Sequence, residues 1–204
     1  MRRGVKLAAL LGSLVAAAAG CMPTYFGASV MNQSNVYQDE GEDNYDGNVY
    51  AVPGYTPAQG LALMQQHIDE QSGAVVIADF EHNGVRSDGA WDTNDHNAYF
   101  SMIFMAETEN RCVVIITPAW LPGYPLADET EEARQDVVTM ATQRQSLGLP
   151  TVITDGWRVR VADHPEYLQP ADYVHLTDDV PDEAHDADTA YSNVVKDAVA
   201  ACPS

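Results

Sequence analysis

The sequence predicts a single α/β domain with a three-layer, doubly wound architecture, in which helices flank a mostly parallel sheet. Short apolar runs alternate along the chain with stretches of helical periodicity, which is typical of this fold class. The length of 204 residues suits one core and a targeting segment. The composition, 46% hydrophobic and 20% charged, argues against a disordered chain and against several membrane spans.

The first twenty residues are typical of a secretory signal peptide. Three basic residues among the first six precede an apolar run from Leu7 to Ala19, too short for the roughly 20 residues that span a bilayer. The run ends in Ala18-Ala19-Gly20-Cys21, which resembles the lipobox of bacterial lipoproteins and implies a lipid on Cys21. The alternative is ordinary cleavage near the same small residues. We expect a signal peptide over 1–20 and one extracytoplasmic domain over 21–204, anchored to a bacterial membrane or secreted.

In the first half of this domain, β-type runs at 24–26 and 49–52 predict two short strands. Thr56-Pro57 predicts an N-cap followed by proline at the first helical position, and Gly73 ends the helix. The apolar residues of this helix share one face: Leu61, Met64 and Ile68. The continuous apolar run at 74–80 predicts a buried parallel strand.

In the second half, helical periodicity resumes near Asp95, and apolar residues at 112–117 predict the next strand. Residues 128–147 predict a long helix, 151–154 the last strand and 188–202 the last helix. We expect these helices to bury one stripe each: Ala98, Met102 and Met105; Ala133, Val137, Met140 and Ala141; Ala190, Val194, Ala198 and Ala201.

Two stretches, 31–48 and 155–187, fit no element, and we expect irregular loops there. The acidic run at 39–46 resembles the start of an EF-hand loop, but the twelfth position of that loop is Pro53 instead of glutamate. The acidic group at 182–186 lacks the spacing of a metal site. We therefore expect solvated loops, with no metal and no cofactor.

The acidic excess narrows the choice of partners. Lys and Arg number 10 against 30 Asp and Glu, which gives a net charge of −20. A chain of this charge repels phosphate backbones, so we expect no nucleic-acid partner. We expect a monomer that contacts the membrane only through its lipid.

Polar groups suited to catalysis follow the expected strands. In a parallel sheet, functional groups gather where the strands end. Ser29 follows the first strand, Gly54 the second and Asn83 the third, while the loop after the last strand carries Asp172 and His175. A hydroxyl, a glycine amide, a carboxamide and an Asp/His pair are the groups that acyl transfer needs. Taken singly, the serine could cap a helix and the pair could lie on the surface.

These residues stand in four blocks that resemble the SGNH, or GDSL-type, hydrolase family. The blocks are FGASV at 26–30, VPGYT around Gly54, Asn83 behind the third strand, and DYVHLT at 172–177. The resemblance implies that Ser29 is the nucleophile, His175 its general base and Asp172 the group that orients the imidazole. It further implies an oxyanion hole made of the Ser29 and Gly54 amides and the Asn83 side chain.

The sequence departs from the family pattern in two of the four blocks. Ala28 stands where the family has the Asp of GDS, and the third block, Gly-x-Asn-Asp in the family, reads Glu81-His82-Asn83-Gly84 here. Thr93-Asn94-Asp95 matches the family text better but lies well beyond the end of the strand, so position favours Asn83.

The resemblance implies an extracytoplasmic serine esterase that works through an acyl-serine intermediate without cofactor or metal. Its substrate would be an acylated small molecule or polysaccharide, such as an acetylated cell-envelope glycan. The altered third block leaves an alternative, a non-catalytic SGNH-like protein that binds glycan or an acylated ligand. A flavodoxin-like ligand-binding protein would need a phosphate-cradling loop after the first strand, and GASVMN is a poor one.

Two cysteines remain once Cys21 is assigned to the signal. An even pair in an oxidising compartment favours a disulfide. Cys112 opens an expected strand and Cys202 closes the last helix. Because helices run antiparallel to the strands in a doubly wound fold, both lie at one edge of the sheet, and we expect them to be bonded.

Overall fold

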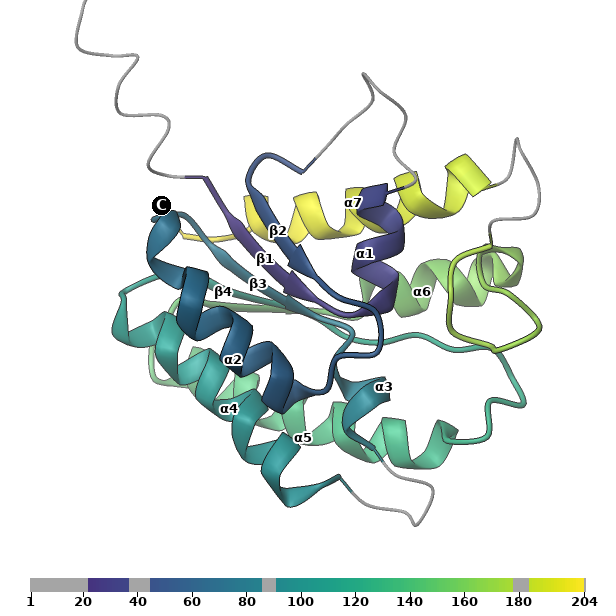
Figure 1. Cartoon of the computed structure of the whole chain (residues 1–204), viewed down its shortest axis with the longest axis horizontal. Helices are drawn as coiled ribbons and strands as arrows, with labels where there is room; N and C mark the ends of the chain where they lie inside the picture. The colour runs from purple at the N-terminus through teal and green to yellow at the C-terminus, as the bar shows by residue number, and fades with distance from the viewer. Residues whose placement is uncertain (1–21, 37–44, 86–90, 178–183, 204) are drawn as a thin grey trace, which may run out of the picture.

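The structure, a computed structural model, describes residues 22–36, 45–85, 91–177 and 184–203 (Figure 1). Its sheet has five strands in the order β2-β1-β3-β4-β5, and all the neighbouring pairs are parallel. The strands are β1 (Thr24–Gly27), β2 (Asn48–Ala51), β3 (Val75–Ala78), β4 (Val113–Ile116) and β5 (Thr151–Thr154). The predicted three-layer α/β fold is thus confirmed.

Helices cover both faces of the sheet. One face carries α1 (Ser29–Val36), α6 (Gly156–Asp163) and α7 (Ala184–Ala200); the other carries α2 (Pro57–His67), α4 (Thr93–Thr108) and α5 (Ala127–Ser146) (Figure 1). Short helical turns complete the structure: η1 (Ile68–Glu70), α3 (Glu81–Gly84) and η2 (Pro165–Tyr167). Successive strand residues alternate between the two cores, so Tyr25 packs on one side and Phe26 on the other.

The strand register brings three segments to one edge of the sheet. Gly27, the last residue of β1, pairs with Ala51 at the end of β2 and with Ala78 at the end of β3. Beyond the strands, Val52 N donates to Gly27 O at 3.2 Å, which keeps the chain after β2 beside the chain after β1. The residues that follow these strands therefore leave the sheet as neighbours.

The predicted helix start at Thr56-Pro57 and the predicted glycine after the long helix, Gly148, are confirmed, whereas α2 ends at His67, well before the expected stop at Gly73. Thr56 N donates to Gln59 Oε1 at 2.9 Å before α2, and Asp92 Oδ1 accepts from Asn94 N at 2.8 Å before α4. Gly148 follows the C-terminal cap of α5 and has a φ of +76°, a conformation that glycine adopts without strain. Within the described residues, no helix has the length and apolar character needed to cross a bilayer.

Several expectations about boundaries are wrong. The stretches 31–48 and 155–187 are not fully irregular, because α1 runs to Val36 and both α6 and η2 lie in the second stretch. The sequence does not predict α6, because its only buried residues are Trp157 and Val161, one turn apart. Two residues are too few to show a hydrophobic period. In α7 the buried stripe includes Tyr191 and Val195, whereas Ala201, expected to face inward, is exposed.

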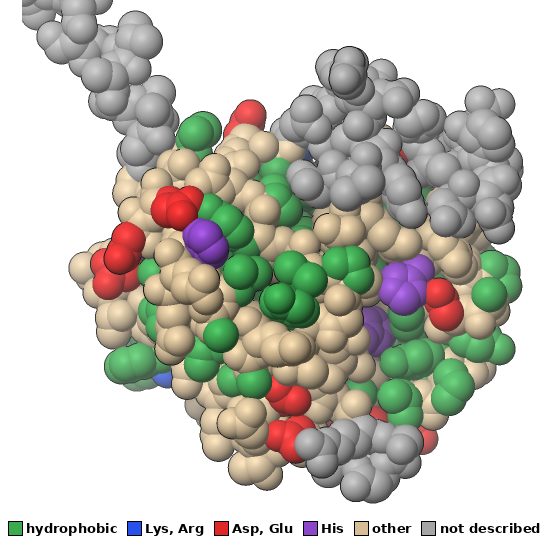
Figure 2. Space-filling model, viewed as in Figure 1, with side chains coloured by type: hydrophobic (Ala, Val, Ile, Leu, Met, Phe, Trp, Pro, Cys, Tyr) green, Lys and Arg blue, Asp and Glu red, His purple; other side chains and the backbone are tan. Residues whose placement is uncertain are grey.

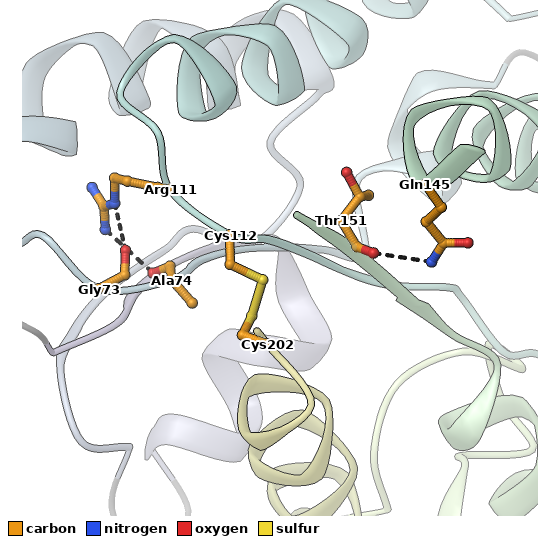
Figure 3. Close-up of a disulfide and its surroundings, with 7 residues drawn as sticks. All are labelled: Gly73, Ala74, Arg111, Cys112, Gln145, Thr151 and Cys202. Carbon is orange, nitrogen blue, oxygen red and sulfur yellow. Dashed lines mark hydrogen bonds between the residues drawn. A yellow bond between two sulfur atoms is a disulfide. The ribbon is translucent and has the colours of Figure 1, made fainter. Parts of the chain in front are cut away.

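The amino edge of the sheet holds the predicted disulfide. Cys112, just before β4, is bonded to Cys202, just after α7, with a Cα–Cα distance of 6.0 Å (Figure 3). The neighbouring Arg111 is buried, and its guanidinium donates to the carbonyl oxygens of Gly73, Ile68 and Ala74 and to Thr24 Oγ1. One disulfide and the hydrogen bonds of one arginine therefore hold this edge together, and the candidate catalytic residues lie at the opposite, carboxyl edge.

Candidate active site

Ser29 is the first residue of α1, directly beyond β1 at the carboxyl edge. Its side chain is partly exposed, and the preceding Ala28 is fully buried. Asn32 N donates to Ala28 O at 3.1 Å, which starts the first helical turn. The serine hydroxyl and backbone amide therefore lie at a helix N-terminus, where the backbone donors have no partners within the helix.

Asp172 and His175 form the pair that the sequence predicts. Asp172 Oδ2 lies 2.7 Å from His175 Nδ1, and Asp172 Oδ1 accepts from the backbone amides of Val174 at 3.1 Å and His175 at 3.0 Å. Partial burial opposes ionisation of Asp172, but the amide donors of His175 and Val174 and the imidazole together hold its pKa below the usual range. With Nδ1 facing a carboxylate, Nε2 is the nitrogen that can accept a proton from a nucleophile.

The loop that carries this pair is held by a backbone bridge and by hydrogen bonds that the sequence does not predict. Leu168 and Leu176 are fully buried and form an antiparallel bridge. Gln169 closes the loop, because its backbone N donates to His175 O at 2.8 Å and its Nε2 donates to Leu176 O at 2.6 Å. The position of the imidazole is thus fixed by residues on both sides of it.

Gln33 joins this loop to the helix of Ser29. Leu176 N donates to Gln33 Oε1 at 3.0 Å across a sequence separation of 143. Gln33 lies four residues after Ser29, so the two side chains share one face of α1. The residue next to His175 is therefore bonded to the face of α1 on which Ser29 lies.

The expected hydrogen bond between Ser29 and His175 is not formed in this structure. Among the described residues, the Ser29 hydroxyl takes part in no hydrogen bond. Catalytic hydrogen bonds are often long in ligand-free enzymes and shorten when substrate binds. The pairing of Ser29 with His175 is therefore part of the proposal made below.

Gly54 and Asn83, two predicted oxyanion donors, lie close together. Asn83 Nδ2 donates to the carbonyl oxygen of Tyr55, the residue after Gly54, at 3.1 Å. Gly54 has a φ of +76°, and a Cβ added there would meet no atom within 4 Å. The space over Gly54 is thus open, and one hydrogen of the Asn83 amide remains for a second acceptor.

The better textual match for the third block has a structural role. Asp92 caps α4 by accepting from Asn94 N and Asp95 N. Asp95 is buried, and its Oδ1 accepts from Ala58 N at 2.9 Å in the first turn of α2. Thr93-Asn94-Asp95 therefore connects two helices on the far side of the sheet from α1.

Aromatic side chains border the site on the side of the β4–α5 connection. The His82 ring packs edge-on against Trp120, at a centroid distance of 6.0 Å, and against Tyr124, at 5.5 Å. Burial lowers the pKa of His82 to about 4, so it is neutral at pH 7. Arg158 lies over Trp120, with its Cζ 4.6 Å from the ring centroid, and donates to Glu131. Figure 2 shows histidine side chains near α1 and α6, beside an acidic side chain and several hydrophobic ones.

No metal centre is seen in the part of the chain that the structure describes: no group of three or more His, Cys, Asp or Glu side chains there could hold an ion. Residues 39–44 of the acidic run, residues 182–183 of the second acidic group, the expected signal segment and Cys21 lie outside the described residues.

Comparison with known proteins places the fold. No protein-family model matches the sequence, and no curated protein sequence matches it. Among solved structures, a GDSL-like lipase from Bacteroides thetaiotaomicron is similar over 87% of each chain, with 15% identity and a TM-score of 0.59. The fold is that of the GDSL-like hydrolases.

Two further structures share this GDSL-like hydrolase fold. The catalytic domain of peptidoglycan O-acetyltransferase A from Streptococcus pneumoniae has 17% identity and a TM-score of 0.65, over 89% of this chain and 94% of that one. An acetyl xylan esterase has 13% identity and a TM-score of 0.59, over 85% of this chain and 98% of that one. At these identities the likeness concerns the fold, and the chemistry must be argued from the residues.

Proposed function

We propose that this protein is an extracytoplasmic serine esterase of the SGNH, or GDSL, type that hydrolyses acyl esters through an acyl-Ser29 intermediate. The observation that carries the proposal is the Asp172–His175 pair at 2.7 Å, held by the Leu176–Gln33 bond against the helix that Ser29 begins. The GDSL-like hydrolase fold supports it, because it is shared with lipases and esterases.

In the proposed reaction, Ser29 Oγ attacks the ester carbonyl carbon while its proton passes to Nε2 of His175. The carbonyl oxygen becomes an oxyanion that accepts from Ser29 N, Gly54 N and Asn83 Nδ2. Collapse breaks the bond to the alcohol, which leaves with the proton from His175. Water, deprotonated by the same imidazole, then attacks the acyl carbonyl carbon; the bond to Ser29 Oγ breaks, the imidazolium returns its proton to Ser29 Oγ, and the acid leaves. Asp172 stabilises the imidazolium in both halves.

We propose an O-acetylated polysaccharide as the substrate class. The aromatic side chains beside the site support this proposal, because the rings of Trp120, Tyr124 and Tyr173 are only partly buried. Such rings offer flat apolar surface with a polar edge, which suits the faces of sugar rings. The net charge of −20 disfavours strongly anionic polymers. Two proteins that share the fold are named for acetylated glycans.

The test is acetate release by the mature wild-type protein from acetylated xylan, from O-acetylated peptidoglycan and from p-nitrophenyl acetate. We expect turnover of the activated ester and of at least one glycan. Binding of glycan without any acetate release would instead support the non-catalytic alternative.

Replacing Asn83 by alanine tests the oxyanion hole. If its amide stabilises the oxyanion, kcat for p-nitrophenyl acetate should fall about 10²- to 10³-fold, or roughly 2.7 to 4 kcal/mol of barrier. KM should change little, because the ground-state carbonyl needs the donor less than the oxyanion does. The matched control is Asn94→Ala on α4, for which we expect unchanged kcat. Wild-type kcat in Asn83→Ala would remove Asn83 from the proposed site.

Replacing Cys21 by serine tests the proposed lipid anchor. The Cys112–Cys202 bond supports an oxidising compartment. Only Met22 and Pro23 separate Cys21 from β1, so Ser29 would lie at the far end of that strand, on the order of 10 Å or more above the anchor at about 3.3 Å per residue. We expect Cys21→Ser protein to leave the membrane fraction with its esterase activity intact. Retention of this variant in membranes would contradict lipidation at Cys21.

A further inference from the structure

Asp79, which directly follows β3, has an uncommon backbone conformation. Its φ is +66°, and its side chain is only 2% exposed. Residues other than glycine seldom adopt a positive φ, and they keep it where the surrounding structure imposes it. Ala78, the last residue of β3, pairs with Gly27 of β1, so Asp79 lies at the level of the turn into α1.

The Asp79 carboxylate bonds two helices that pack on the same face of the sheet. Its Oδ2 accepts from Met31 N at 2.8 Å, and both oxygens lie 3.0 Å from the hydroxyl of Tyr191 on α7. Tyr191 is fully buried. One side chain therefore joins β3, α1 and α7 beneath the carboxyl edge.

The bond to Met31 replaces a missing helix cap. A helix N-cap normally accepts from the amide of the second or third helical residue through its own side chain. The residue before α1 is Ala28, which has no acceptor, and Met31 is the third residue of the helix. Asp79 supplies the acceptor from another strand, and its negative charge suits the positive end of the helix.

Burial raises the pKa of Asp79 to about 6, against the effects of the Met31 amide, the Tyr191 hydroxyl and the His175 imidazole. The titratable groups that interact electrostatically with it are Tyr191 on α7, Tyr45 before β2, Tyr99 on α4, Glu81 on α3 and His175. Burial raises the pKa of Glu81 to about 8, so Glu81 is mostly neutral at pH 7 while Asp79 is ionised. At neutral pH, Asp79 thus places a carboxylate beside the first turn of α1, where it accepts from Met31 N.

We propose that Asp79 is a positioning residue for acyl transfer: by capping α1 from β3, it fixes the Ser29 hydroxyl and amide relative to the substrate carbonyl. This inference rests on the proposed esterase function. The positioning effect of Asp79 can be distinguished from an effect on stability, because an ionised buried carboxylate destabilises the fold. A carboxyl whose pKa is raised on folding stabilises the protein below its unfolded value of 3.8, and that contribution is lost as the pH rises through about 6.

The test compares two replacements of Asp79 with a matched control. Asp79→Gly permits the positive φ but removes the acceptor, whereas Asp79→Asn tolerates the same backbone and keeps a carbonyl oxygen for Met31 N. Asp95→Asn is the control, because Asp95 is a buried carboxyl on α4 that accepts from Ala58 N on α2, on the far side of the sheet from α1. The measurements are kcat and KM for p-nitrophenyl acetate, the rate of fluorophosphonate labelling of Ser29, and melting temperature.

We expect Asp79→Gly to lower kcat and the labelling rate about 100-fold with KM within about threefold, as for a misplaced reacting group. Asp79→Asn should recover to within about tenfold of wild type and melt no lower than wild type at pH 7.5, since its side chain is neutral. The ratio of wild-type to Asn kcat should shrink between pH 7.5 and 5, because wild-type Asp79 is then protonated and resembles asparagine. Asp95→Asn should match wild type in kcat.

Each other outcome is decisive. A kcat for Asp79→Gly within about threefold of an active wild type would overturn the positioning role, whatever its melting temperature. If the Gly variant does not fold, a pH-independent ratio of wild-type to Asn kcat overturns it instead. A wild-type protein that neither turns over ester nor reacts with fluorophosphonate rejects the esterase and this inference together, which distinguishes that failure from the first.

Discussion

Replacing Ser29 by alanine is expected to abolish ester hydrolysis, with kcat for an activated ester reduced about 10⁴-fold or more. The substitution removes the oxygen that forms the acyl intermediate in the proposed mechanism. The fold should persist, because the Ser29 hydroxyl makes no hydrogen bond to a described residue and alanine favours helices. Steady-state kinetics and a thermal melt of the same preparation measure both parts of this expectation.

Ser101 provides the matched control for this substitution. It lies exposed on α4, where its hydroxyl donates only to Asn97 O in the preceding turn. Ser101→Ala should therefore hydrolyse ester at the wild-type rate. If Ser29→Ala kept more than about a tenth of the wild-type kcat while remaining folded, the nucleophile would have to be another group.

Removing the Cys112–Cys202 disulfide is expected to have the largest effect on stability. The bond closes a loop spanning 90 residues, and in the chain-entropy model a loop of that size stabilises a protein by about 4 to 5 kcal/mol. We expect the double variant Cys112→Ala, Cys202→Ala to lose about that much free energy of unfolding in a urea titration at 25 °C. Its kcat at low temperature should remain near wild type, because the bond lies at the amino edge of the sheet and Ser29 at the carboxyl edge.

Reduction of the wild-type protein is the control for the disulfide. Dithiothreitol should lower the urea midpoint of wild type toward that of the double variant and leave the double variant unchanged. Two thiols that react with an alkylating agent in the denatured, unreduced mature protein would show that the bond is absent.

The sequence predicts the fold well where apolar residues form runs or stripes. All five strands lie within about one to two residues of the expected segments, because each is a short apolar run bounded by polar or turn residues. The apolar pattern does not predict α6 or most of α1, since a helix with two or three buried residues has no clear hydrophobic period. The burial of Tyr191 is also missed, because its hydroxyl donates to the Asp79 carboxylate, a residue far away in the sequence.

The candidate site is predictable to the extent that it follows strand ends. Ser29, Gly54 and Asn83 follow three adjacent strands, and the order of the strands brings them to one edge. The Asp172–His175 bond is local and follows from its spacing of three residues. The contacts that orient these groups join residues far apart in the chain: Leu176 with Gln33 and Asp79 with Met31. Such contacts leave no periodic or local signal in a single sequence.

The most direct test of the account is the site at which a fluorophosphonate reacts. Mature wild-type protein should take up one equivalent, and mass spectrometry of the digested protein should place the adduct on Ser29. Labelling should disappear in Ser29→Ala and slow strongly in His175→Ala, because the hydroxyl is activated by the imidazole. An adduct on any other residue, or wild-type protein that remains unlabelled while folded, would contradict the proposal that Ser29 is the nucleophile of an esterase.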